Sequence, residues 1–336
     1  MALATGIIDI RGFVMRRSLF TPFGASVLLS RQRAFSVGSW TLWSEAGVPE
    51  CFTTSMERNR NAKPKTLSWK VTDAPHLCAG GNAAAEQWQH DVYGEILDCA
   101  YQWAAHGGEI DAILWAKLKV LVEAAQSEWN KPDHGIWEVR TAGRPFTYSA
   151  AMCQVALDRG ARLARRFKLQ GNTTAWQAAS TEIRNAILEE AWDDRVKSLI
   201  EHLGGGGLDA SLLSLPLRRV IPADHPKMVA TAAAIAERLS AGNGLLYRYL
   251  PEESPDGLPG HEGAFLLCSF WMVDNLAHQG RIDEAMEIYQ SLCRRAGSLG
   301  LLPEQIDPGS GAFLGNYPQG FSHIGVISSG VNLPDG

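Results

Sequence analysis

The chain has 336 residues, of which 46% are hydrophobic and 20% charged, so it can form a large core and is not wholly disordered. Its formal net charge is -5, without the basic stripe that nucleic-acid binders carry. No apolar run reaches the roughly 20 residues of a membrane-spanning helix, so neither nucleic acid nor membrane is an expected partner. The six cysteines include no CxxC pair. Cys99, Cys153 and Cys268 fall within apolar helical patterns and fit small buried side chains in a reducing compartment, and we expect no metal site.

The first 75 residues are predicted to form an irregular segment that is separate from the rest of the chain. They show no sustained hydrophobic period, and residues 57–66 (ERNRNAKPKT) are strongly polar. Between Arg11 and Ser44 there are arginines and serines but no acidic residue, a composition that resembles a mitochondrial transit peptide. The alternative is a poorly structured stretch in a cytoplasmic protein, and we expect the cytoplasm.

Residues 76–336 are predicted to form one all-α domain. Apolar residues recur there at helical spacing, and no alternation typical of strands is found. The pair Gly107 and Gly108 ends the first predicted helix, as a C-terminal stop signal should. The predicted helices lie near residues 83–105, 111–129, 147–168, 173–191, 209–219, 226–239, 262–278, 281–297 and 320–329.

Two acidic loops between predicted helices carry groups suited to acid–base chemistry. In the first, GIWEVR, Glu138 follows a tryptophan. Apolar surroundings favour the protonated form of a carboxyl group, which is the form that a general acid needs. The second loop, LPEQID, contains Glu304 and is followed by the hydroxyl-binding side chains of GNYPQ. Inverting glycoside hydrolysis requires two carboxyl groups facing each other, roughly 6.5–9.5 Å apart.

Residues 82–330 resemble the bacterial and archaeal branch of glycoside hydrolase family fifteen, which includes glucoamylases and trehalases. The resemblance implies an (α/α)6 barrel in which Glu138 is the general acid and Glu304 the general base, with no metal or organic cofactor. It rests on segments that occur in the family's order and spacing, namely GNAAAEQWQHDVYGEILD, PDHGIWEVR, FTYSAAMCQVALDRGARLARRF, LDASLLSLPL, GLLYRY, DGLPGHEGAFLLCSFWMVDNLAHQGRIDEA and GLLPEQIDPGSGAFLGNYPQGFSHIGVI.

The same resemblance implies four substrate-binding residues. Gln87 and Asp91 would border the substrate cleft, or alternatively lie on an exposed helix face. Arg248 would donate hydrogen bonds to sugar hydroxyls, or alternatively form a surface ion pair. Trp137 would wall the pocket of the acid rather than stack on a sugar ring. For Glu262 we expect capping of the following helix rather than substrate binding.

The N-terminal part of the family has no counterpart in this sequence. We find neither its β-sandwich domain nor the Arg-Asp segment that grips terminal glucose, and only about nine of the twelve barrel helices. Such an incomplete barrel should expose the apolar flanks of the helices near residues 85–105 and 320–329. The resemblance implies an inverting hydrolase that releases glucose from an oligosaccharide or disaccharide, with a glucoamylase favoured over a trehalase. The alternative of another class is an inactive fragment or sugar-binding remnant.

Overall fold

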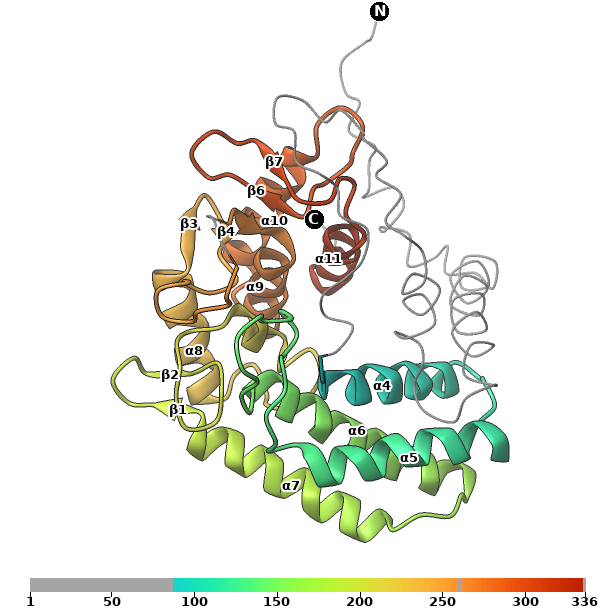
Figure 1. Ribbon diagram of the computed structural model, residues 1–336. Coiled ribbons are helices and arrows are strands. Elements are labelled where there is room, and N and C mark those ends of the chain that lie inside the picture. Colours follow the sequence, from blue (N-terminus) through green and yellow to red (C-terminus); the bar gives the residue numbers. More distant parts are fainter. Residues whose placement is uncertain (1–86, 259–261, 335–336) are drawn as a thin grey trace, which may run out of the picture. The chain divides into compact units, whose positions relative to one another are not determined.

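The computed structural model describes residues 87–258 and 262–334, which are mostly helical (Figure 1). The predicted all-α class is confirmed at this level, while the segment 1–75 that was predicted to be irregular lies outside the described residues. No helix in the described part is both long and apolar enough to cross a membrane. The α-helices are α4 (Asp91–Ala105), α5 (Ala112–Glu128), α6 (Thr147–Phe167), α7 (Thr173–Glu190), α8 (Pro226–Arg238), α9 (Leu266–His278), α10 (Ile282–Cys293) and α11 (Gly320–Asn332), and the 3₁₀ helices are η3 (Ala210–Ser214) and η4 (Arg294–Ala296).

Helix α6 is the centre of a first group of helices, in which it contacts α4, α5 and α7 (Figure 1). Its close approach to α4 requires Gly94, because a Cβ at that position would lie 2.3 Å from the Met152 carbonyl oxygen. The neighbouring helices begin at side-chain caps: Asp111 accepts an N–H at the start of α5, and Asn172 does so at the start of α7. These caps explain why the predicted bounds of both helices match the structure closely.

Helix α9 is the centre of a second group, where it contacts α8, α10, α11 and η3. Its sequence LLCSFWMV is apolar on nearly every side, which is typical of a helix with neighbours all round. Phe270 and Val273 are fully buried within it. They belong to an apolar core that also includes Phe265 and Ile306, so the core reaches the loops that carry the predicted site.

One face of α11 is apolar and exposed. The helix contains no Asp, Glu, Lys or Arg. The predicted exposure of apolar flanks is confirmed here, because four large side chains at helical spacing are more than half exposed. They are Phe321, Ile324, Ile327 and Val331. The prediction is wrong for α4, whose large apolar side chains are all at least half-buried. The exposed apolar residue in that region is Trp88, just before the helix.

The described part also contains short strands, and one pair of them, β5 and β6, joins loops that are far apart in the sequence. The sequence showed no strand pattern, and this expectation of no strands is wrong. The strands were missed because two or three residues are too few to show an alternation. All the pairs are antiparallel, and β5, β6 and β7 form a three-stranded sheet in which Phe265 lies opposite Gln305. The strands are β1 (Trp192–Asp193), β2 (Ser198–Leu199), β3 (Ser240–Gly242), β4 (Leu245–Leu246), β5 (Ala264–Phe265), β6 (Gln305–Ile306) and β7 (Phe313–Leu314).

Three predicted helices have different bounds in the structure. The helix predicted over 209–219 is only the 3₁₀ helix η3, followed by turns, because Pro216 lacks the N–H that would continue the helix. The helix predicted from residue 262 begins at Leu266, because Ala264 and Phe265 pair in β5. The helix predicted over 83–105 begins at Asp91, and residues 87–89 before it are not helical.

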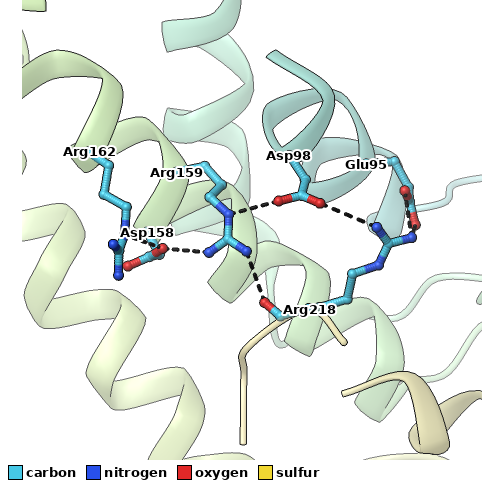
Figure 2. A network of polar contacts seen from close by, with 6 residues as sticks. All are labelled: Glu95, Asp98, Asp158, Arg159, Arg162 and Arg218. Carbon is cyan, nitrogen blue, oxygen red and sulfur yellow. Dashed lines mark hydrogen bonds and ion pairs between the residues drawn. The ribbon is translucent and has the colours of Figure 1, made fainter. Parts of the chain in front are cut away.

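A buried ionic network joins α4, α6 and the segment after η3 (Figure 2). The Arg159 side chain, only 6% exposed, donates from Nε to Asp98 (2.8 Å) and from Nη1 to Asp158 (2.6 Å). Its Nη2 donates to the Arg218 carbonyl (3.0 Å), and the Arg218 guanidinium in turn pairs with Glu95 (2.9 Å) and Asp98 (3.3 Å). Each buried charge therefore has an opposite charge within hydrogen-bond distance, which buried ions require.

We predict that Arg159→Ala lowers the free energy of unfolding by about 3 kcal/mol, because it removes the buried cation that Asp98 and Asp158 share and leaves them only the more exposed Arg218 and Arg162. The matched control is Arg162→Ala, which removes a side chain that is 54% exposed and also pairs with Asp158. This exposed pair should be worth about 1 kcal/mol or less. Denaturant unfolding of the two variants measures the difference, and equal losses would contradict the role assigned to the network.

Candidate active site

Glu138 lies in a tight, strained turn. Its N–H donates to the Gly135 carbonyl (3.2 Å), and the Val139 N–H donates to the His134 carbonyl (3.1 Å). Both Gly135 and Glu138 have left-handed backbone, with φ of 63° and 53°. This conformation is uncommon for a residue other than glycine, and it persists where the surroundings fix it, often at functional sites.

The turn is held at its base by further backbone hydrogen bonds. Asp133 and Arg144 exchange two such bonds, of 2.9 and 2.8 Å, which closes the loop that carries Glu138. The Arg140 N–H donates to the Asp256 carbonyl (2.6 Å) and ties the loop to a third segment. The position of Glu138 is therefore fixed from both sides of the turn.

The apolar surroundings predicted for Glu138 are found only in part. The adjacent Trp137 is half-buried in an aromatic cluster, but the side chain of Glu138 is 32% exposed. The Arg140 Nη2 lies 3.9 Å from its Oε2, so a cation stands beside the predicted acid. The prediction of an apolar pocket was wrong in this respect, because Arg140 faces the same side of the turn.

Trp137 is packed against other aromatic rings of the protein. This favours its predicted role of lining the pocket of Glu138 over that of stacking on a sugar ring. Its ring contacts those of Tyr249, Phe265 and Trp271, with centroids 6.5, 5.5 and 6.2 Å away. The indole Nε1 donates to Asp209 Oδ1 (2.9 Å). Both the ring and its only polar atom are therefore engaged by the protein.

Arg248 lies over the same aromatic cluster. Its guanidinium carbon is 5.1 Å from the Trp137 ring centroid, 5.2 Å from that of Tyr249 and 5.3 Å from that of Phe265. Its Nε donates to Glu262 Oε2 (2.9 Å), and its Nη2 donates to Glu262 Oε1. Arg248 therefore forms the ion pair of the predicted alternative, but not on the surface, because its side chain is only 12% exposed. Its predicted hydrogen bonds to sugar hydroxyls stay a prediction.

The expected cap at Glu262 is also corrected by this ion pair. Helix α9 begins after Phe265, and no side chain accepts a hydrogen bond at its first turn. The Glu262 carboxylate faces Arg248 instead. The sequence places Glu262 near the start of a helix. Its side chain nevertheless pairs with Arg248, which lies 14 residues earlier in the chain.

Glu304 is held by the loop that follows β7. Its N–H donates to the Asn316 carbonyl (2.9 Å), and its carbonyl accepts the Leu266 N–H (3.1 Å). Its carboxylate Oε2 accepts both the backbone N–H and the side-chain Nδ2–H of Asn316, each at 2.9 Å. Both of these bonds end on the same carboxylate oxygen, Oε2.

The structure brings the two acidic loops to a common residue. Phe265 packs against Trp137, next to Glu138, and it pairs in the sheet with Gln305, next to Glu304. Phe265 therefore contacts both loops, the first through its ring and the second through its backbone. The separation of the two carboxyl groups that inversion requires stays a prediction.

The segment before α4 lies along the loop of Glu138. The Trp88 carbonyl accepts the His134 N–H (2.9 Å), and the His90 N–H donates to Asp133 Oδ2 (3.0 Å). Gln87 lies just before this segment, is half-buried and is not on a helix. The exposed-helix alternative is therefore wrong for Gln87, and its predicted contact with substrate stays a prediction.

Asp91 is the first residue of α4 and is buried, which also overturns its exposed-helix alternative. Burial, together with the negative charges of Asp133 and Glu95, raises the pKa of Asp91 to about 7. Its Oδ1 has no hydrogen-bond partner among the described residues. A buried carboxyl beside the loop of Glu138 fits the predicted border of the cleft, although its contact with substrate stays a prediction.

Residues that the sequence analysis missed hold the predicted ones in place. Asp209 accepts the hydrogen bond of Trp137, Asn316 anchors Glu304, and Asp133 closes the loop of Glu138. All three belong to the segments that resemble the family, but their roles depend on partners elsewhere in the chain. No group of three or more His, Cys, Asp or Glu side chains within the described ranges could hold a metal ion.

Comparison with known proteins decides the family. The family model for glycosyl hydrolases family 15 matches residues 71–331. The chain belongs to this family. It is 43% identical over 256 residues to a trehalase of Mycolicibacterium smegmatis, covering 75% of this chain and 38% of that protein. It is 36% identical over 255 residues to a trehalase of Thermoplasma volcanium, covering 76% of this chain and 40% of that one.

The chain thus spans about two fifths of the length of these curated relatives. A solved structure of a wild-type glycosidase aligns with a TM-score of 0.62 at 23% identity, covering 74% of this chain and 68% of that chain. The shared fold is therefore that of known glycosidases over most of this family 15 chain.

We predict that Gly315→Ala impairs the site through Glu304. Gly315 has φ of 71°, and a Cβ there would lie 2.6 Å from Glu304 Oε2. The matched control is Gly311→Ala, because Gly311 has φ of 75° but open space where its Cβ would lie. Both variants should lose about 1–2 kcal/mol of stability through backbone strain. Only Gly315→Ala should lower glycosidase turnover at least about tenfold, by moving the carboxylate. Equal turnover in the two variants would contradict the orientation described for Glu304.

A further prediction concerns the pH dependence of stability. Because the pKa of Asp91 is about 7 in the folded protein and 3.8 without burial, the folded state keeps the proton between these values. This group therefore lowers the stability of the protein as pH rises from 3.8 to about 7, and the loss levels off above that. Asp91→Asn removes the buried charge. Its stability relative to the parent protein should rise by about 3 kcal/mol between pH 5 and pH 8. Denaturant unfolding at both pH values tests this, and parallel curves would refute it.

Proposed function

We propose that this chain derives from an inverting α-glucosidic hydrolase that acts on α,α-trehalose. The observation that carries the proposal is the meeting of the two acidic loops at Phe265 in a member of glycosyl hydrolases family 15. Trehalose is favoured over maltose-type oligosaccharides because the relatives of greatest similarity given above are trehalases. This reverses the order of substrates that the sequence alone favoured.

In the proposed mechanism Glu138 protonates the glycosidic oxygen while Glu304 activates a water molecule. The water attacks the anomeric carbon from the opposite face of the ring, and Glu304 takes its proton. Such proton transfers accelerate a reaction by typically 10²–10⁴-fold each. Arg248, fixed by Glu262 and the aromatic cluster, would hold sugar hydroxyls beside the acid, and Gln87 and Asp91 would border the same cleft.

We infer that the described helices form part of an (α/α)6 barrel. The mainly helical architecture and the fold shared with known glycosidases support this inference. Two observations favour a barrel of which the described residues form only a part. The apolar face of α11 is exposed, and the chain spans about two fifths of the length of its curated relatives. The same two observations keep an inactive, sugar-binding remnant as the second candidate.

The first test is glucose release by the full chain on trehalose and on maltotriose, assayed in parallel. Activity is expected on trehalose, and activity on maltotriose alone would support a glucoamylase instead. Absence of glucose from both substrates would favour the inactive remnant. Inversion is read by NMR, because hydrolysis of α,α-trehalose with inversion gives one α-glucose and one β-glucose. Initial release of α-glucose alone would contradict the inverting mechanism.

The second test assigns the two carboxyl groups. Glu138→Gln and Glu304→Gln should each lower turnover of trehalose by at least about 10²-fold, because each removes one proton transfer. The matched control is Glu123→Gln, since Glu123 lies on α5 with a side chain that is 54% exposed. Its turnover should stay within about twofold of the parent protein. Loss of activity in the control alone would overturn the assignment.

A further inference from the structure

Asp209 is a buried carboxylate that nothing in the proposed mechanism uses. It is 2% exposed and stands directly before η3, where its Oδ1 accepts the Ser211 N–H (2.7 Å). The same oxygen accepts the indole N–H of Trp137 (2.9 Å). Desolvation by burial raises the pKa of this carboxyl to about 6. A buried carboxyl is costly unless its hydrogen bonds offset the burial, and one of these bonds reaches the candidate site.

The Trp137 side chain links two parts of that site. It precedes Glu138 directly in the strained turn, so a shift of the indole changes the backbone that carries the predicted acid. One face of its ring lies 5.1 Å from the Arg248 guanidinium. The aromatic neighbours limit how the ring tilts. The hydrogen bond to Asp209 determines that the Nε1 edge of the indole faces η3.

We propose that Asp209 is a positioning residue of the candidate site: by holding the Trp137 indole it fixes both Glu138 and Arg248. The part of this proposal that concerns catalysis rests on the proposed function. A bond from an indole N–H to a carboxylate is charge-assisted and stronger than one to a neutral acceptor. Asp209 is itself anchored by the Ser211 N–H, so it is a rigid point of attachment for the ring.

The first experiment needs no substrate. Amide hydrogen exchange is measured for Glu138, Val139 and Arg140, whose N–H groups donate within or from the turn. Asp209→Ala and Trp137→Phe should each speed exchange at these amides at least tenfold. Asp209→Asn, which keeps an oxygen acceptor and the helix cap, should restore most of the protection.

The matched control for this experiment is Asp274→Ala. Asp274 is equally buried, and its carboxylate accepts bonds from Ser328 (3.2 Å) and Asn332 (3.1 Å) of α11 rather than from the site. The Asp274→Ala variant should leave the exchange rates of the Glu138, Val139 and Arg140 amides unchanged relative to those of other protected amides. Equal acceleration by Asp209→Ala and Asp274→Ala, or no acceleration by either, would overturn the positioning role.

The second experiment is a double-mutant cycle on trehalose turnover. Asp209→Ala and Trp137→Phe should each lower kcat by about 10- to 100-fold, because each misplaces Glu138, and each should also raise KM, because Arg248 loses its support. The double variant should be no worse than the more impaired single variant, since both remove one contact. A loss in the double variant equal to the product of the single losses would contradict the proposal. If the parent protein hydrolyses neither sugar while the exchange pattern holds, the proposed function fails and the positioning role stands.

Discussion

The contact between Trp137 and Phe265 joins the two halves of the candidate site. The ring centroids are 5.5 Å apart with the planes at 72°, an edge-to-face arrangement that aromatic pairs prefer. Trp137 is covalently next to Glu138, and Phe265 pairs across the sheet with Gln305, next to Glu304. The rest of the site is arranged around this pair, because Arg248 lies over both rings and Glu262 is held there by Arg248.

The helices support this contact by two different means. Around α9 the support is apolar, and the core that contains Phe270 and Val273 extends to Phe265 itself. Around α6 it is partly ionic, since Arg159 and Arg218 join α4 to α6 through buried carboxylates (Figure 2). Removing one partner of a buried pair is costly because it leaves the other charge less compensated, so this network opposes a separation of α4 from α6. The segment that leads into α4 then lies beside the loop of Glu138 through His90 and Asp133.

The sequence predicted the helices whose signals are local and missed the features that depend on distant partners. The bounds of α5 and α7 follow from apolar periodicity and a capping side chain, so both were predicted closely. The helix expected over 209–219 is only the 3₁₀ helix η3, because Pro216 lacks the N–H that would continue it. Strands of two residues carry no period at all. Glu138 and Glu304 were predicted from family segments, whereas the contacts of Asp209, Asn316 and Glu262 are created only by the fold.

The central claim is that Glu138 and Glu304 act as an inverting pair across one bond. The distance between their carboxyl groups in a crystal structure of the chain tests it most directly. We expect a separation of roughly 6.5–9.5 Å across a shared cleft, which leaves room for the attacking water. A separation of about 5–5.5 Å would indicate a retaining enzyme instead. Carboxyl groups that face different sides of the protein would contradict the assignment of both residues.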